Sequence, residues 1–173
     1  ATIILEYGSG GSTALAASLG DCRVFSVESD KVWLRTLQDW INQKPPENKI
    51  QFHYASIGPT MEWGKPENYS KLRAIQYLQH SHSVWKRSDF KHPDLVLIDG
   101  RFRIGCFMAT IKNIKKPIRI LFDDYADREC YHYVEEFAKP TFLVERMAVF
   151  DVSPGLAPSI PGIKQLRAML VPT

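Results

Sequence analysis

Short apolar runs alternate along this chain with segments of good helix formers. The runs expected to form strands are 2–6, 23–28, 50–55, 94–99 and 118–123. The segments expected to be helical are 12–19, 30–41, 69–85 and 104–114. Strands that are apolar throughout are buried on both faces, and parallel neighbours need a crossover between them. The alternation therefore predicts an α/β fold, a doubly wound and mostly parallel sheet with helices on both faces.

The C-terminal third departs from this alternation. A further helix is expected at 131–137, and apolar residues without helical spacing at 141–152 predict a late antiparallel strand or hairpin. Residues 163–171 fit either a helix or an edge strand, and both remain open. A chain of 173 residues fits one domain, 1–173. Within it, the long polar stretch 58–92 is expected to be an insertion or a lid.

Composition and charge exclude several classes of protein. A scattered net charge of +3 gives no reason to expect nucleic acid, and no apolar run is long enough to span a membrane. Cys22, Cys106 and Cys130 stand too far apart for a zinc knuckle or a disulfide framework, which favours a cytoplasmic, reducing compartment. The sequence does not tell what precedes Ala1, and it leaves the oligomeric state open, a homodimer included.

A glycine turn follows the first expected strand. In Gly8-Ser9-Gly10-Gly11, backbone amides and the positive end of the next helix would face a ligand that bulky side chains would block, so a nucleotide-like ligand is expected. The dinucleotide fingerprint needs glycine where Thr13 stands, and the Gly-Lys pair of a phosphate-binding loop is absent. The alternative is a turn that only lets the helix pack on the sheet.

Two glutamates end the first two strands. Glu6 stands two positions before the first glycine, where a carboxylate would repel a pyrophosphate but would suit a cationic ligand such as the methionine end of S-adenosylmethionine. Glu28 ends the second strand, where a carboxylate can accept hydrogen bonds from both ribose hydroxyls. The alternative for Glu28 is a surface residue at a strand end.

The segments ILEYGSGGSTALAA and VFSVESD resemble motifs I and II of the class I S-adenosylmethionine-dependent methyltransferases. The resemblance implies a cofactor site with the methionine and ribose portions along the first segment, the ribose on the second strand end, and the adenine beside the third strand end. Ser12 stands where the family often has a third glycine. The implied cofactor-binding residues are Glu6, Tyr7, Gly8, Ser9, Gly10, Glu28, Ser29, Ala55, Ser56 and Asp99.

Acidic residues also end the fourth and fifth strands. Asp99, Asp123 and Asp124 should meet at the edge where an open α/β sheet binds its ligands, and their repulsion calls for a cation, basic partners or raised pKa values. IDG and FDD resemble motifs of the metal-dependent catechol-type O-methyltransferases, which implies these aspartates as ligands of Mg²⁺ or a similar hard cation. Phe102 stands where that family has a lysine base, so the catalytic base is unassigned.

Arg101 and Arg103 offer an alternative to the metal. They could neutralise the aspartates as ion pairs, or they could bind a carboxylate or phosphate of a substrate. The expected function is methyl transfer from S-adenosylmethionine to an oxygen or nitrogen of a small molecule, with Asp99, Arg101 and Asp123 as candidate catalytic residues. The alternatives are an inactive methyltransferase-like domain that binds a cofactor or a partner, and an NAD-dependent oxidoreductase.

Overall fold

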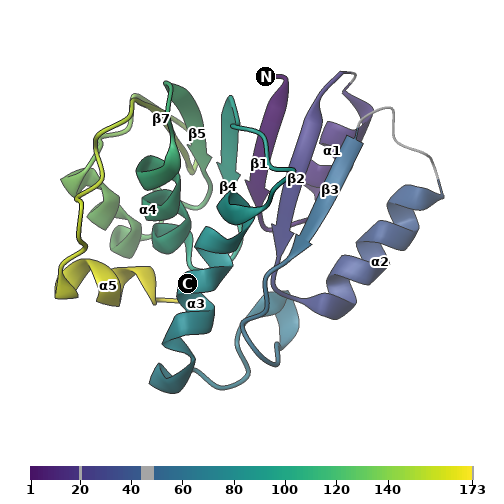
Figure 1. Ribbon diagram of the computed structural model, residues 1–173, viewed down its shortest axis with the longest axis horizontal. Coiled ribbons are helices and arrows are strands. Elements are labelled where there is room, and N and C mark those ends of the chain that lie inside the picture. Colours follow the sequence, from purple (N-terminus) through teal and green to yellow (C-terminus); the bar gives the residue numbers. More distant parts are fainter. Residues whose placement is uncertain (20, 44–48, 173) are drawn as a thin grey trace.

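The fold is built on one seven-stranded sheet with the strand order β3-β2-β1-β4-β5-β7-β6 (Figure 1). A computed structural model describes residues 1–19, 21–43 and 49–172. β1 to β5 are parallel, whereas β7 runs antiparallel to both β5 and β6. This confirms the predicted doubly wound sheet and the late hairpin. The strands are β1 (Ile3–Tyr7), β2 (Arg23–Glu28), β3 (Lys49–Tyr54), β4 (Leu95–Ile98), β5 (Ile118–Phe122), β6 (Phe142–Val144) and β7 (Met147–Val152).

Helices cover the sheet in two groups. α4 contacts both α3 and α5, while α1 contacts β2 and β3, and α2 contacts β3. In Figure 1, α4 lies in front of the sheet and α1 behind it. None of the helices in the described part of the chain is long and apolar enough to cross a bilayer. The helices are α1 (Gly11–Ser18), α2 (Lys31–Asn42), α3 (Ala74–His82), α4 (Arg103–Asn113) and α5 (Ile163–Met169).

Two expected helices differ in detail from the structure, and the segment that fits either a helix or a strand forms a helix. The helix expected at 69–85 is divided into a 3-10 turn, α3 and a second 3-10 turn, Ser83–Lys86. Near the end of α3 the Ser81 hydroxyl donates to the Leu78 carbonyl, which competes with the helical ladder. The helix expected at 131–137 is a 3-10 helix, Glu129–Glu136, and the segment left open between helix and strand contains α5.

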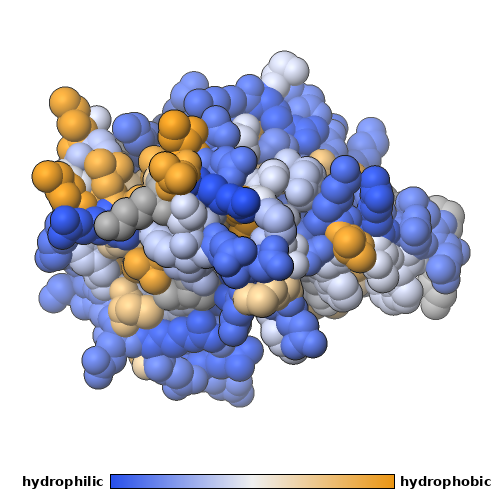
Figure 2. Space-filling view, turned by 90° about the horizontal axis from the view of Figure 1, so that it is seen from below, coloured by the Kyte–Doolittle hydropathy of each residue, from blue (hydrophilic) through white to orange (hydrophobic). Residues whose placement is uncertain are grey.

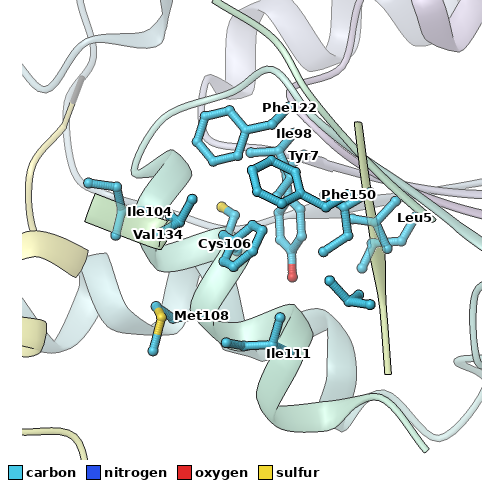
Figure 3. Close-up of a cluster of buried hydrophobic side chains, with 14 of the residues drawn as sticks. Leu5, Tyr7, Ile98, Ile104, Cys106, Met108, Ile111, Phe122, Val134 and Phe150 are labelled. Atoms are coloured by element: carbon cyan, nitrogen blue, oxygen red, sulfur yellow. The ribbon is translucent and has the colours of Figure 1, made fainter. Parts of the chain in front are cut away.

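The main core lies between the sheet and α4. Every residue of α4 from Arg103 to Ile111 is buried, because the helix packs on the sheet and is covered by α3 and α5. Burying each large apolar side chain contributes about 1.5–3 kcal/mol, so this helix is fixed firmly against the strands. Figure 3 shows the side chains that meet there, among them Leu5, Tyr7, Ile98, Cys106, Ile111, Phe122 and Phe150.

The register brings the ends of four strands to one edge of the sheet. Tyr7 of β1 pairs with Val27 of β2 and with Ile98 of β4, and Ile98 pairs with Phe122 of β5. Backbone hydrogen bonds extend the ladder one step further, because the amides of Gly8, Asp99 and Asp123 donate to the carbonyls of neighbouring strands. The residues that follow each strand are therefore held on a rigid edge.

Candidate functional site

A pocket of about 1560 Å³ lies over this edge of the sheet. Its walls come from the turn after β1, the end of β2, residues 60–65, and the turns after β4 and β5. Figure 2 views this side of the molecule, where hydrophilic residues cover most of the middle and hydrophobic ones gather on the left, toward α5. A pocket at the carboxyl ends of parallel strands is the usual ligand site of this architecture.

Backbone contact between two turns forms the floor of the pocket. Gly8 has a φ of +99°, and a Cβ placed there would lie 2.6 Å from the Cα and the amide nitrogen of Gly100. The turns after β1 and β4 therefore meet with no room for a side chain at Gly8. Gly8, Ser9, Gly10 and Gly11 line the pocket beside this contact.

Glu28 forms the wall beside the end of β2. Its carboxylate accepts hydrogen bonds from the amides of Ser9 (3.1 Å), Ser29 (2.6 Å) and Asp30 (2.8 Å). Burial raises the pKa of Glu28, and these three amide hydrogen bonds oppose that rise. Each carboxylate oxygen has more than one lone pair, so Glu28 can still accept from ligand hydroxyls in the pocket that it lines.

Glu6 lies below the glycine turn and is almost completely buried. Its carboxylate accepts hydrogen bonds from the hydroxyls of Ser12, Thr13 and Ser26. Burial raises the pKa of Glu6, and the three hydroxyls oppose the rise. The carboxylate thus ties β1, β2 and the start of α1 together. Among the described residues Glu6 is not part of the pocket lining.

The other expected cofactor residues divide in the same way. Two that do not line the pocket have internal partners: the Tyr7 hydroxyl donates to the carbonyl of Ser81, and the Ser56 hydroxyl accepts from the Gly58 amide. The expected residues that line the pocket are Gly8, Ser9, Gly10, Glu28, Ser29 and Asp99. Those that do not are Glu6, Tyr7, Ala55 and Ser56.

Residues 60–65 cover the pocket beside β2. The Thr60 hydroxyl donates to Asp30 (2.9 Å), and Gly64 lies against Ser29 and Glu28. Trp63 has a φ of 62° and is 83% exposed at the rim. This part of the stretch expected to be an insertion or lid is therefore docked directly on the strand end that carries Glu28.

Arg103 lies among the three aspartates at the other end of the pocket. Its Nη2 is 2.9 Å from Asp99 Oδ1 and 3.2 Å from Asp124 Oδ2, and Nη1 is 4.0 Å from Asp123 Oδ2. The same guanidinium donates to the carbonyls of Gly100, Asp123 and Asp99. For Arg103, the expected ion-pair alternative is confirmed. The buried guanidinium is fixed by six polar contacts in all.

Two more arginines complete the neutralisation of this acidic cluster. Arg128 pairs with Asp124 at 2.9 Å, and Arg146 reaches Asp123 at 3.3 Å and Asp124 at 3.4 Å. The ligand atoms of the three aspartates lie within 4.8 Å of one another, a spacing that could suit a cation. However, a divalent ion there would have to displace Arg103 and would face three guanidinium charges. The residues present therefore fit arginine better than Mg²⁺.

Comparison with solved structures decides the family. A methyltransferase-like protein from Silicibacter pomeroyi DSS-3 is 42% identical, with a TM-score of 0.90 over 98% of this chain and 88% of that chain. The chain belongs to the class I methyltransferase family. This likeness covers the glycine turn, the strand ends and the C-terminal hairpin together.

More distant structures also resemble this methyltransferase. A proposed O-methyltransferase from Klebsiella pneumoniae is 15% identical over 98% of this chain and 59% of that chain, with a TM-score of 0.49. The YcgJ protein from Bacillus subtilis is 15% identical over 72% of this chain and 45% of that chain, with a TM-score of 0.41. These two add nothing to the conclusion. No protein-family model matches the sequence, and no curated protein matches it significantly.

Strained backbone shapes the acidic end of this methyltransferase. Phe102 has a φ of 54° and Asp124 a φ of 57°, in the left-handed region that residues other than glycine seldom adopt. Phe102 is fully buried and stacks on Tyr77 at 4.8 Å between ring centroids. Phe102 stands in the chain between Arg101 and Arg103, which both line the pocket, Arg103 being buried. Strained residues of this kind cluster at functional sites.

Among the pocket-lining residues that sequence reasoning missed, four have side chains that matter for the chemistry of the site. Trp33 donates from Nε1 to the carbonyl of Ser9, and its position on the face of α2 near Asp30 was the available signal. Arg146 comes from the β6–β7 hairpin and reaches the site only through its pairing with β5, whereas Arg128 lies four residues after Asp124, a spacing that was a local signal. His80 lies on α3, and no spacing in the sequence connects it with the strand ends. The four are Trp33, His80, Arg128 and Arg146.

Proposed function

We propose that this chain transfers a methyl group from S-adenosylmethionine to an oxygen or nitrogen atom of a small molecule. One observation carries the proposal: a single pocket joins Glu28, the backbone of the glycine turn and Asp99 along the same sheet edge. Membership of the class I methyltransferase family supports it further. The donor set suits a nucleoside with ribose hydroxyls, which Glu28 can accept, and a polar end that lies over the turn.

The residues of this site contribute mostly positioning. S-adenosylmethionine, when bound, supplies an electrophilic methyl group on a sulfonium. Glu28 would hold the ribose, and Gly8 and Gly10 would let a ligand approach the backbone closely. Residues 60–65 would exclude water from the nucleoside end. Holding two reactants in line in this way is a large part of the rate enhancement in group transfer.

Asp99 is our candidate for the group that receives the acceptor's proton. Burial raises the pKa of Asp99 to about 6, and repulsion from Asp123 and Asp124 adds to this rise, whereas Arg103 opposes it. Side-chain exposure of 43% leaves the carboxylate open to an acceptor. A carboxylate with a pKa near neutrality suits general base catalysis. Phe102, which stands where metal-dependent relatives have lysine, is buried and has no such chemistry.

The second candidate is a cofactor-binding domain without turnover. The observation that favours it is the acidic cluster, where Arg103 fills the place that a catalytic metal would need. A panel of phenols, carboxylic acids and amines, assayed for S-adenosylhomocysteine production, separates the two candidates. Turnover of any acceptor supports the enzyme, and tight cofactor binding with no turnover of the panel supports the binding domain.

Calorimetric titration with S-adenosylhomocysteine tests the cofactor itself. We expect saturable binding, weakened about tenfold or more in Glu28→Gln, because a hydrogen bond to a charged group contributes about 1.5–3 kcal/mol. Glu129→Gln is the matched control, since Glu129 is exposed on a 3-10 helix and does not line the pocket. No heat from the wild-type chain at millimolar ligand, or displacement by NADH at lower concentration, would refute the proposal.

A further inference from the structure

We propose that the methyl acceptor is an anion whose carboxylate or phosphate group is bound by Arg101. This inference rests on the proposed function, because it names the acceptor of that reaction. It assigns the end of the pocket beyond β4 to an acid rather than to a neutral phenol or amine.

Among the described residues at this end of the pocket, Arg101 is an arginine without a carboxylate partner. The three aspartates are matched by Arg103, Arg128 and Arg146, each within 4.0 Å of at least one carboxylate. Within residues 1–19, 21–43 and 49–172, no carboxylate lies within that distance of Arg101, although it lines the same pocket. Its charge is left for a ligand to neutralise.

The surroundings of Arg101 make an anionic ligand favourable. Burial lowers the pKa of Arg101, and the positive charges of Arg103 and Arg128 lower it further, while Tyr131 and Asp99 oppose this lowering. An oxyanion beside the guanidinium would relieve both effects. The planar fork of arginine binds carboxylate and phosphate through two parallel hydrogen bonds, which gives orientation as well as affinity.

His80 provides a second, independent sign that this end of the pocket is built for a polar ligand. Its side chain is 1% exposed and lines the pocket, with Nδ1 3.3 Å from the Ala55 carbonyl oxygen. Nε2 is buried without a close hydrogen-bond partner among the described residues, although the backbone of Arg101 lies near the ring. Buried polar atoms in native proteins are nearly always satisfied, so a ligand group or a bound water is expected at Nε2.

The position of Arg101 favours the acceptor over the cofactor as the source of the anion. Arg101 follows β4, whereas Glu28 ends β2, and β1 lies between these two strands. Strands about 4.8 Å apart place the two residues roughly 10 Å from each other along the sheet edge. The carboxylate of the cofactor's own methionine portion has the same chemistry, and the experiment below separates the two sources.

The experiment is a fluorescence titration of the intact chain with inorganic phosphate and with benzoate, using Trp33 and Trp63 in the pocket as reporters. Each titration is run with and without S-adenosylhomocysteine, and with sodium chloride at matched ionic strength. We expect saturable binding that Arg101→Gln weakens at least about tenfold, as for loss of a charged hydrogen bond. Arg119→Gln is the control, because Arg119 is exposed and pairs with Asp151 outside the pocket.

Two results would overturn the inference. One is equal anion binding by the wild-type chain and Arg101→Gln, or a signal no larger than that of chloride. The other comes from the cofactor: if Arg101→Gln weakens S-adenosylhomocysteine but not 5′-methylthioadenosine, which lacks the amino-acid portion, then Arg101 binds the cofactor's carboxylate. Failure of S-adenosylhomocysteine to bind at all would instead refute the proposed function. The anion titrations without cofactor would still test whether Arg101 binds an anion.

Discussion

Replacing Arg103 by methionine should strongly destabilise the fold. Its guanidinium holds Asp99 at 2.9 Å and Asp124 at 3.2 Å and donates to three backbone carbonyls. Removing one partner of a buried ion pair costs about 3–5 kcal/mol, because the remaining charges are left unpaired. In a domain of this size, about 3 °C of melting temperature is lost per kcal/mol, so Arg103→Met should melt roughly 12 °C lower.

Urea and thermal unfolding followed by circular dichroism measure this loss. Arg103→Lys keeps the charge without the fork and should fall between Arg103→Met and the wild type, while Arg119→Met controls for loss of an exposed arginine. Millimolar magnesium should raise the melting temperature of Arg103→Met, whose aspartates then lack their cation, and leave the wild type unchanged. A loss in Arg103→Met no larger than that in Arg119→Met, or magnesium stabilisation of the wild type, would refute this reasoning.

Three further predictions concern the sheet edge and the pocket wall. Burial lowers the pKa of His80 from 6.5 to about 4, so between these values the unfolded chain takes up a proton that the folded chain does not. Stability should therefore fall on acidification through this window, by up to ~1.4 kcal/mol per pH unit, and His80→Gln should flatten the slope; an unchanged slope in urea titrations would contradict it. Gly8→Ala forces a Cβ to 2.6 Å from Gly100 and should destabilise the chain and weaken S-adenosylhomocysteine binding, whereas Gly11→Ala, with open space at its Cβ, should do neither. Glu6→Ala removes the carboxylate that accepts from three hydroxyls, those of Thr13 and Ser26 buried and that of Ser12 half-buried, and should cost at least about 1–3 kcal/mol in urea unfolding. The loss should exceed that of Glu6→Gln, which keeps one acceptor oxygen, and equal losses would argue against the hydroxyl cluster.

The sheet and its functional edge were predictable because both follow from local sequence. Apolar runs that end in Glu28, Asp99 and Asp123 place these carboxylates at the carboxyl ends of parallel strands, wherever each strand pairs. Glycine at position 8 likewise indicates a close backbone approach without showing what it approaches. These inferences depend on residues a few positions apart, which fix strand, turn and helix together.

The partners of these residues could not be read from the sequence. Arg146 reaches Asp123 only because β7 pairs antiparallel with β5, a long-range choice that no local pattern fixes. The inward orientation of Glu6, by contrast, could have been predicted from the sequence. In the parallel register of β1 and β2, Glu6 lies beside Ser26, so both point to the same face. A carboxylate beside hydroxyls at a strand end was the signal of an internal partner.

The central claim is that the pocket over the strand ends holds a sulfonium nucleoside by Glu28 and the glycine turn. A crystal structure of the complex with S-adenosylhomocysteine tests it most directly. We expect the ribose hydroxyls within hydrogen-bond distance of Glu28, the thioether over Gly8–Gly11, and Arg101 facing unfilled space beside the sulfur. A ligand bound elsewhere, or a ribose that does not contact Glu28, would contradict it.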